Sequence, residues 1–527
     1  ISGTGSFTLD SGDVTLTGQN TFDGNVLLKG SSILTLDSSS ALYHGLSVNQ
    51  AGNLTIEGTA TLNLNGQTIS VKNFTLDGGT VNKNGLATSK LNFLSATLNA
   101  GEFGGSLGGG APTASLTKAT AGALILSGDN SDFKGQVFLN EGSITLDHPK
   151  ALTAENEIIF SAVPTSVRTL ILNSNVSVKA LSGGTDDAGN ESQLDLNGKT
   201  LTIDGGTGTA VNTFDGVFAS SGTVIKKGSS TQVFTGASNV ALTSVSVEGG
   251  VLQLGNADAL GNVATDVTVS DAVLSLKYDS GTSPLHNLTV QGVTQVVNDR
   301  ATVGAGIART LGTLAFGTDG KLLISAGSNA SGTPELTFGA VSLSGAAELD
   351  VDGSSKVTFG AINGPASTFV KAGEGELVLS STASFAGATS FQGKLTMGAN
   401  NAVGSGDLTI QQGGILALGT YSQGVASLTV NSGTISGAGS INALGDITLN
   451  GGLVSSTVNG VNLIVNADTT IAQAGSISGT TSINAGTLTL QQNNALGAGE
   501  LNLASGATLA IGSTVQTVDG ADIAGLI

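Results

Sequence analysis

Cysteine and tryptophan are absent from this 527-residue chain, which also holds a single methionine and only six prolines. Without cysteine the chain forms no disulfide bond and offers no thiolate as a nucleophile or metal ligand. The scarcity of proline, together with glycines that show no period of three, excludes a collagen-like chain. Hydrophobic residues still make up 39% of the sequence, so the composition is not that of a disordered, charge-rich chain either.

Basic residues are also scarce. The chain has 19 lysines and arginines but 38 acidic residues, which gives a formal net charge of −19. Only three arginines occur, at positions 168, 300 and 309. Nucleic-acid binding needs clustered cations that displace counterions from phosphate, so this function is excluded. An anionic membrane surface would repel the chain, and no run of about 18 apolar residues is present to span a bilayer. We therefore predict no nucleic-acid partner and no membrane insertion by this segment.

The pattern that is present is an alternation of apolar and polar residues over three to five positions. Examples are Phe7-Thr-Leu-Asp, Leu54-Thr-Ile-Glu and Leu194-Asp-Leu-Asn. Successive side chains of a strand point to opposite faces, so each stretch predicts a short strand with one buried face. Helical periodicity is nearly absent, and the 79 glycines mark frequent tight turns between strands.

A longer repeat organises these strands. The segment Gly486-Thr-Leu-Thr-Leu-Gln-Gln-Asn-Asn-Ala-Leu-Gly matches Gly393-Lys-Leu-Thr-Met-Gly-Ala-Asn-Asn-Ala-Val-Gly in the same frame. Further copies begin at Gly250 and Gly142, and a weaker one begins at Ser31. Asparagine tolerates the left-handed backbone region and glycine adopts it freely, so the Asn-Asn-Ala-Leu-Gly segment predicts a corner.

The repeat extends upstream, where Phe369-Val-Lys-Ala-Gly, Leu116-Thr-Lys and Val224-Ile-Lys-Lys-Gly precede three of these copies. The order Lys-x-Gly, Leu-x-Leu, aromatic-x-Gly, Gly-x-Leu-x-Leu, Asn-x-Ala-Leu-Gly resembles the passenger-associated transport repeat of bacterial autotransporters. Two departures occur. The first copy of the whole repeat, which begins near residue 5, has Asp10 in the place of the lysine. The copies at 31 and 142 continue with Tyr43 and Thr153 where the closing glycine is expected.

The repeat predicts an all-β fold, a right-handed parallel β-helix (β-solenoid) with three short strands per coil and roughly 25 coils. One coil cannot bury its inner face alone, and stacking neighbours in register closes a continuous core. We expect residues 1–527 to form one β-helical passenger segment, excised from a precursor whose signal peptide and C-terminal outer-membrane barrel are absent here. Three segments break the rhythm and predict protruding loops, near 101–115, 182–193 and 297–310.

Residues for catalysis are sparse. The histidines, at 44, 148 and 286, are far apart in the sequence, and the serine of Gly104-Gly-Ser106-Leu-Gly108 lacks the strand and helix that a nucleophile elbow requires. The aspartate pair Asp350 and Asp352 lacks the third ligand of a calcium loop, and Asp186-Asp187 would attract a cation only loosely. We predict no catalytic, cofactor-binding or metal-binding residue and no cofactor, and the sequence assigns no residue to partner binding.

The resemblance implies export through the outer membrane to the bacterial cell surface or the extracellular space. Members of the family without an enzyme domain mostly mediate adhesion, self-aggregation and biofilm formation. The expected function is thus that of a non-enzymatic adhesin, whose partners are host or bacterial surface molecules or like passenger domains on neighbouring cells. The alternative is a β-helical polysaccharide-active enzyme, either a lyase or a tailspike-like hydrolase. An acidic cleft would favour the enzyme, and uncharged Asn/Thr ladders would favour adhesion.

Overall fold

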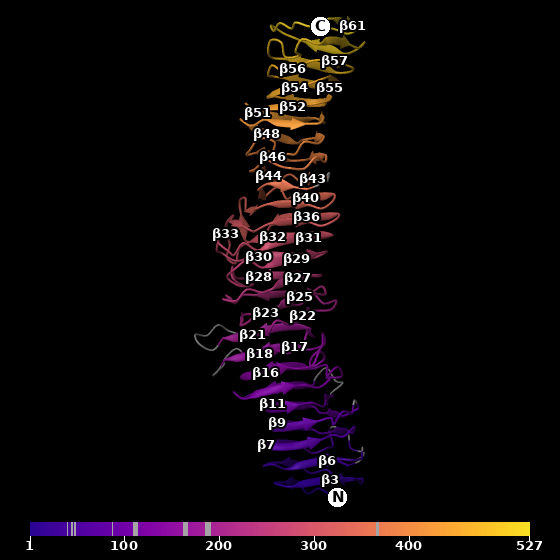
Figure 1. The fold of residues 1–527 in the computed structure, drawn as a ribbon, viewed down its shortest axis with the longest axis vertical. Helices are drawn as coiled ribbons and strands as arrows, with labels where there is room; N and C mark the ends of the chain where they lie inside the picture. The colour runs from indigo at the N-terminus through magenta and orange to yellow at the C-terminus, as the bar shows by residue number, and fades with distance from the viewer. Residues whose placement is uncertain are drawn as a thin grey trace. The chain divides into compact units, whose positions relative to one another are not determined.

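The computed structural model of the chain describes residues 1–38, 41–43, 46, 49–86, 88–108, 114–161, 167–184, 191–364 and 368–527. The secondary-structure elements of these residues are all β-strands, and no helix occurs among them. The strands form a parallel β-solenoid of about 24 turns. Figure 1 shows the strands in chain order, coloured from the N-terminus to the C-terminus. They fall into two compact units, Ile1–Thr265 and Asp266–Ile527. The predicted all-β solenoid is confirmed, and the behaviour of the chain as one cooperative stack stays a prediction.

Coils of the first unit repeat about every 20 residues. Thr223 pairs with Ser244, and Thr231 pairs with Val251 on the next side of the coil. Both pairings are parallel, as expected where each strand lies beside its equivalent in the next coil. The strands concerned are β25 (Thr223–Lys227), β26 (Thr231–Phe234), β27 (Ser244–Val247) and β28 (Val251–Leu254).

The second unit is built in the same way. Glu376, Lys394 and Ile415 occupy equivalent positions in three successive coils and pair in parallel register. Their strands, with the one that follows in the same sheet, are β44 (Glu376–Leu379), β46 (Lys394–Met397), β48 (Ile415–Gly419) and β51 (Gly433–Gly437). One outer side of this unit is formed by a separate sheet of β49 (Gln423–Val425), β52 (Ser440–Ala443), β54 (Thr457–Gly460) and β56 (Ser476–Ile477).

The core lies inside the coils and follows the alternation seen in the sequence. In β58 (Thr487–Leu490), Leu488 and Leu490 are buried, whereas Thr487 and Thr489 are partly exposed. Full burial of one leucine side chain stabilises the folded state by about 1.5–3 kcal/mol, so repetition of this pattern over many strands supplies the stability. The register inferred from the sequence is therefore confirmed at this strand.

The predicted corners adopt the expected backbone. Asn401 has a φ of 50° and Asn494 a φ of 52°, and the glycines that close these corners, Gly404 and Gly497, have φ values of 88° and 72°. The Ala-Leu or Ala-Val pair between them is buried. In the weak copy that begins at Ser31, Tyr43 takes the left-handed conformation with a φ of 55°. The copy therefore keeps the turn of the other corners without its glycine.

Candidate binding surface

The lysine of the repeat is a structural residue. Lys118, Lys226 and Lys371 are fully buried, at the ends of β13 (Ser115–Lys118), β25 and β43 (Phe369–Ala372). The Lys371 ammonium donates hydrogen bonds to the carbonyl oxygens of Gly373 at 2.6 Å and Gln392 at 2.8 Å. Because Gln392 lies one coil further along, the lysine ties successive coils together.

The other two lysines repeat this arrangement. Lys226 donates to the carbonyls of Lys227, Gly228 and Gly249, and Lys118 donates to those of Thr120 and Glu141. Burial lowers the pKa of each of the three ammonium groups to about 8. At neutral pH they are still mostly charged, which suits donors to several carbonyl oxygens.

A row of polar side chains runs across successive coils on the outside of the second unit. Each member after the first donates a hydrogen bond from its side-chain amide nitrogen to the side-chain oxygen of the member before it, at 2.9 to 3.3 Å. All are at least partly exposed to solvent. We call this row the amide ladder, and its members are Ser390, Gln411, Asn431, Asn450, Asn466 and Asn484.

The first unit carries a shorter row of the same kind. The Asn73 amide donates to Asn53 Oδ1 at 2.9 Å, and the Ser95 hydroxyl donates to Asn73 Oδ1 at 2.8 Å. The backbone N–H of Asn53 in turn donates to Asn25 Oδ1 at 3.0 Å. Side-chain ladders of this kind form where asparagine recurs at equivalent positions of stacked strands.

The ladders present a regular and neutral hydrogen-bonding surface. A primary amide has two N–H donors and two acceptor lone pairs, and one ladder contact on each side uses only one of each. The ladder leaves the other donor and acceptor of each amide unused, and every rung is at least partly exposed to solvent. Neighbouring rungs are spaced by the distance between strands, about 4.8 Å. A partner with repeated polar groups can therefore bind along many rungs by individually weak hydrogen bonds.

The third segment predicted to protrude, 297–310, forms an ordered structure at one side of the second unit (Figure 1). Within it, β33 (Gly304–Ala305) pairs in parallel with β37 (Ala330–Ser331) from a second excursion in the following coil. Asn329 joins the two excursions, because its amide donates to the carbonyls of Arg300 and Ala301 at 2.9 and 3.1 Å. We call residues 299–308 and 327–334 together the side platform.

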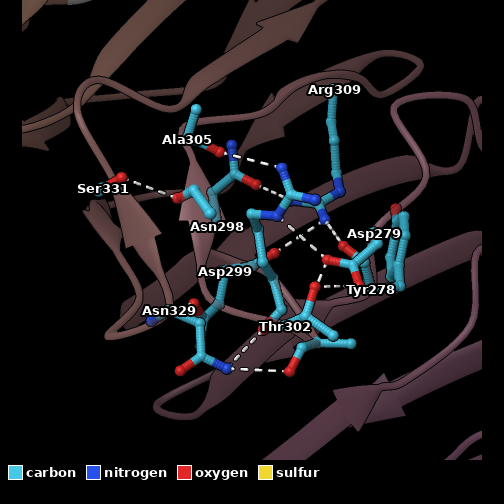
Figure 2. A network of polar contacts seen from close by, with 12 residues as sticks. Tyr278, Asp279, Asn298, Asp299, Thr302, Ala305, Arg309, Asn329 and Ser331 are labelled. Carbon is cyan, nitrogen blue, oxygen red and sulfur yellow. Dashed lines mark hydrogen bonds and ion pairs between the residues drawn. The ribbon is translucent and has the colours of Figure 1, made fainter.

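Arg309 anchors the platform to the coil beneath it (Figure 2). Its guanidinium is buried and donates to Asn298 Oδ1 and to the carbonyl oxygens of Tyr278 and Asp299. The guanidinium carbon also lies 4.2 Å from the centre of the Tyr278 ring, within range of a cation–π contact. Burial lowers the pKa of Arg309, yet a guanidinium stays protonated at any ordinary pH.

Arg300 secures the outer edge of the same network by pairing with Asp279. Its Nε atom lies 3.1 Å from Asp279 Oδ1, and the Thr302 hydroxyl donates to the other carboxylate oxygen at 2.8 Å. These hydrogen bonds, first that of Thr302, lower the pKa of Asp279. The sequence analysis placed Arg300 and Arg309 in a protruding loop. It did not predict that Arg309 is buried and anchors this loop. The available signal was the occurrence of two of only three arginines in one segment.

The other two predicted loops are described only in part. Near 101–115, strands occupy much of the described chain, with Phe103 ending β11 (Ser95–Phe103) and Ser115 beginning β13, while 109–113 lie outside the described residues. Near 182–193, the chain is strand up to Gly183 and again from Ser192, and 185–190, with Asp186 and Asp187, lie outside the described residues.

Of the residues weighed for chemistry, Ser106 and His148 line one cavity of the first unit. Ser106 lies in the two-residue strand β12 (Ser106–Leu107), and its hydroxyl donates to the carbonyl oxygen of Asp129. His148 and His286 lie in different units, and His44 is outside the described residues. Across the described chain, no group of three or more His, Cys, Asp or Glu is arranged to hold a metal ion. The described residues also contain no helix long and apolar enough to cross a membrane.

Two curated proteins share sequence similarity with this chain. The adhesin BmaC autotransporter of Brucella suis biovar 1 (strain 1330) is 27% identical over 245 residues, which cover 45% of this chain. The probable autotransporter YfaL of Escherichia coli (strain K12) is 28% identical over 198 residues, which cover 34% of this chain. The chain is similar to bacterial autotransporters. No protein-family model matches it.

The region aligned with this autotransporter-like chain is only a small part of the length of each relative. The aligned residues span 7% of BmaC and 16% of YfaL. The parallel β-solenoid fold is consistent with a passenger domain, and the resemblance drawn from the repeat is confirmed. The repeat that carries the resemblance is the one whose lysines are buried between coils.

Proposed function

We propose that this chain is part of a surface-exposed autotransporter passenger that acts as an adhesin and binds surface molecules or like chains. The observation that carries the proposal is the amide ladder, a neutral row of paired side chains in which each amide has one donor and one acceptor that the ladder does not use. The similarity to BmaC, which is named an adhesin, supports the same function. Export through the outer membrane to the cell surface is part of this proposal.

Association along a ladder is spread over many contacts, and this distinguishes it from a catalytic site. One hydrogen bond contributes about 0.5–1.5 kcal/mol, so a single rung carries a small share of the binding free energy. We therefore expect activity to fall in steps as rungs are removed. A catalytic centre would lose its activity with one residue.

The test uses beads coated with the purified chain. We expect clumping or attachment of the beads to fall in steps from the single variant Asn450→Ala to the triple variant Asn431→Ala/Asn450→Ala/Asn466→Ala. Asn502→Ala is the control for the single variant, because Asn502 is also an exposed strand asparagine but lies outside the ladder. Circular dichroism checks that each variant is folded. Unchanged clumping by the folded triple variant would contradict the role of the ladder.

A further inference from the structure

Two adjoining cavities open on the first unit, and Lys83 lines both. The first has a volume of about 310 Å³ and is also lined by Ser106, Asp129, Ser131, Asp132 and His148. The second has a volume of about 400 Å³ and is also lined by Asn82, Asn84, Glu102 and Ser127. We call the two together the Lys83 cleft. Its combined size lies in the range of ligand-binding pockets, about 300–1,000 Å³.

The cleft combines residues from four successive coils. Lys83 follows β9 (Asn73–Asn82), Glu102 lies in β11, Asp129 follows β14 (Ala123–Leu126), and His148 follows β16 (Gly142–Leu146). Glycine keeps part of it open, because a Cβ atom at Gly104 would lie 3.3 Å from the Ser127 hydroxyl. The cleft therefore runs across several coils.

Charges in the cleft are mostly balanced. Asp129 forms an ion pair with Lys150 at 3.3 Å, and Asp132 forms one with Lys90. Burial by itself would raise the pKa of Asp129, but hydrogen bonds from Ser131 and the nearby Lys150 outweigh it and lower the pKa. Asp129 thus remains a charged acceptor at neutral pH. Lys83, partly exposed where the cavities meet, makes no ion pair with any other described residue.

We propose that the Lys83 cleft binds an oligosaccharide, which deepens the adhesin function proposed above and rests on it. Sugar hydroxyls both donate and accept hydrogen bonds, and the lining combines acceptors such as Asp132 and Glu102 with donors such as Lys83 and the side-chain amide of Asn84. A nucleic acid would need clustered unpaired cations, and a peptide anchor would need an apolar pocket. The lining side chains offer neither.

The Lys83 ammonium can serve two kinds of sugar. It can donate hydrogen bonds to the hydroxyls of a neutral sugar, or it can form a charge-assisted hydrogen bond with the carboxylate of a uronic acid. Lys83→Gln separates the two, because glutamine keeps a donor and loses the charge. Binding of a neutral glycan is expected to survive this change, whereas binding of an acidic glycan is expected to fall at least tenfold.

The experiment measures binding of the full chain to immobilised neutral and uronic-acid-containing oligosaccharides. We expect binding to at least one of them, weakened tenfold or more in Lys83→Ala/Glu102→Ala. Lys134→Ala is the control, because Lys134 is an exposed lysine of the same unit that does not line the cleft. Thermal unfolding should be unchanged in both variants, since Lys83 and Glu102 are partly exposed or exposed.

Bead clumping is measured in parallel so that the two proposals can fail separately. If beads clump but no oligosaccharide binds, or if the double variant binds as well as the unmodified chain, the cleft proposal is overturned and the adhesin proposal stands. If the chain neither clumps beads nor binds any surface or glycan, both proposals are overturned. Shortening of a bound glycan would overturn the non-enzymatic function and favour the polysaccharide-active alternative.

Discussion

At the scale of single residues, the buried lysines of the repeat are the most costly groups to place in the core. Removing an ammonium group from water is unfavourable by several kcal/mol unless hydrogen bonds replace its hydration. At Lys371 the carbonyl oxygens of Gly373 and Gln392 do this in part, and the lowered pKa of about 8 records the cost that remains. The same arrangement recurs at Lys118 and Lys226.

This cost predicts a pH dependence of stability. The folded pKa of Lys371 is about 8, below the ordinary value of 10.5. Between these values the unfolded chain binds the proton and the folded chain does not, so the free energy of unfolding rises with pH. The increase from each such lysine is about 1–3 kcal/mol. It is complete near pH 10.5 and absent below pH 8.

Urea unfolding of Lys371→Met between pH 7.5 and 10.5 checks this expectation. We expect the variant to lack the share of the increase that Lys371 contributes, while Lys118 and Lys226 keep theirs. Lys394→Met is the matched control, because Lys394 is an exposed lysine of the same unit, in an ion pair with Glu376 at 2.9 Å. If both variants show the same dependence on pH as the unmodified chain, the interpretation of Lys371 is wrong.

At the scale of elements, the side platform depends on the flat guanidinium of Arg309. Lysine has no planar fork and cannot bond Asn298 and two carbonyl oxygens together while stacking on Tyr278. We expect Arg309→Lys to weaken the platform locally by about 2–4 kcal/mol, since several hydrogen bonds from a charged donor are lost. Hydrogen exchange should then accelerate in 299–310 and 327–334 while exchange in the strands of the coils stays unchanged.

Arg300→Lys is the control, because Arg300 belongs to the same excursion but pairs with Asp279 at the more exposed edge of the network. Exposed ion pairs contribute about 1 kcal/mol or less, so exchange should change little in this variant. Equal exchange in both variants would show that the platform does not depend on its buried anchor.

The elements also show how far the sequence alone leads. Strands such as Thr487–Leu490 and corners such as Asn494 were predictable, because alternation and backbone preference are local properties. The members of the amide ladder were not. Their separation along the chain varies from 21 residues between Ser390 and Gln411 to 16 between Asn450 and Asn466, because the coils differ in length. Because the coil length is not fixed, the spacing in the sequence does not show which residue of the next coil pairs with each asparagine.

The Lys83 cleft and the side platform could not be predicted from the sequence, for a related reason. Lys83 meets Asp129 and His148 only because the intervening coils stack, and no sequence motif joins them. The burial of Arg309 depends on Tyr278, 31 residues earlier. Position in the coil, set by the stacking of distant strands, determines both sites. The sequence could show only that polar and charged residues were available.

At the scale of the whole molecule, the net charge of −19 opposes association between copies of the chain. Attraction along neutral ladders is short-ranged, whereas repulsion between the acidic chains extends over the Debye length. That length is about 30 Å at 0.01 M ionic strength and about 3 Å at 1 M. Added salt therefore removes the repulsion and leaves the ladder contacts in place.

Self-association should accordingly strengthen with salt. We expect clumping of beads coated with the chain to increase steadily as sodium chloride is raised from about 0.01 M to about 1 M. Light scattering of the bead suspension measures it. The triple variant Asn431→Ala/Asn450→Ala/Asn466→Ala should clump less than the unmodified chain at every salt concentration, because screening removes its repulsion but does not restore the three lost rungs. Clumping that weakens with salt would indicate ion pairs between chains, and would show that charge complementarity, rather than the amide ladder, holds the chains together.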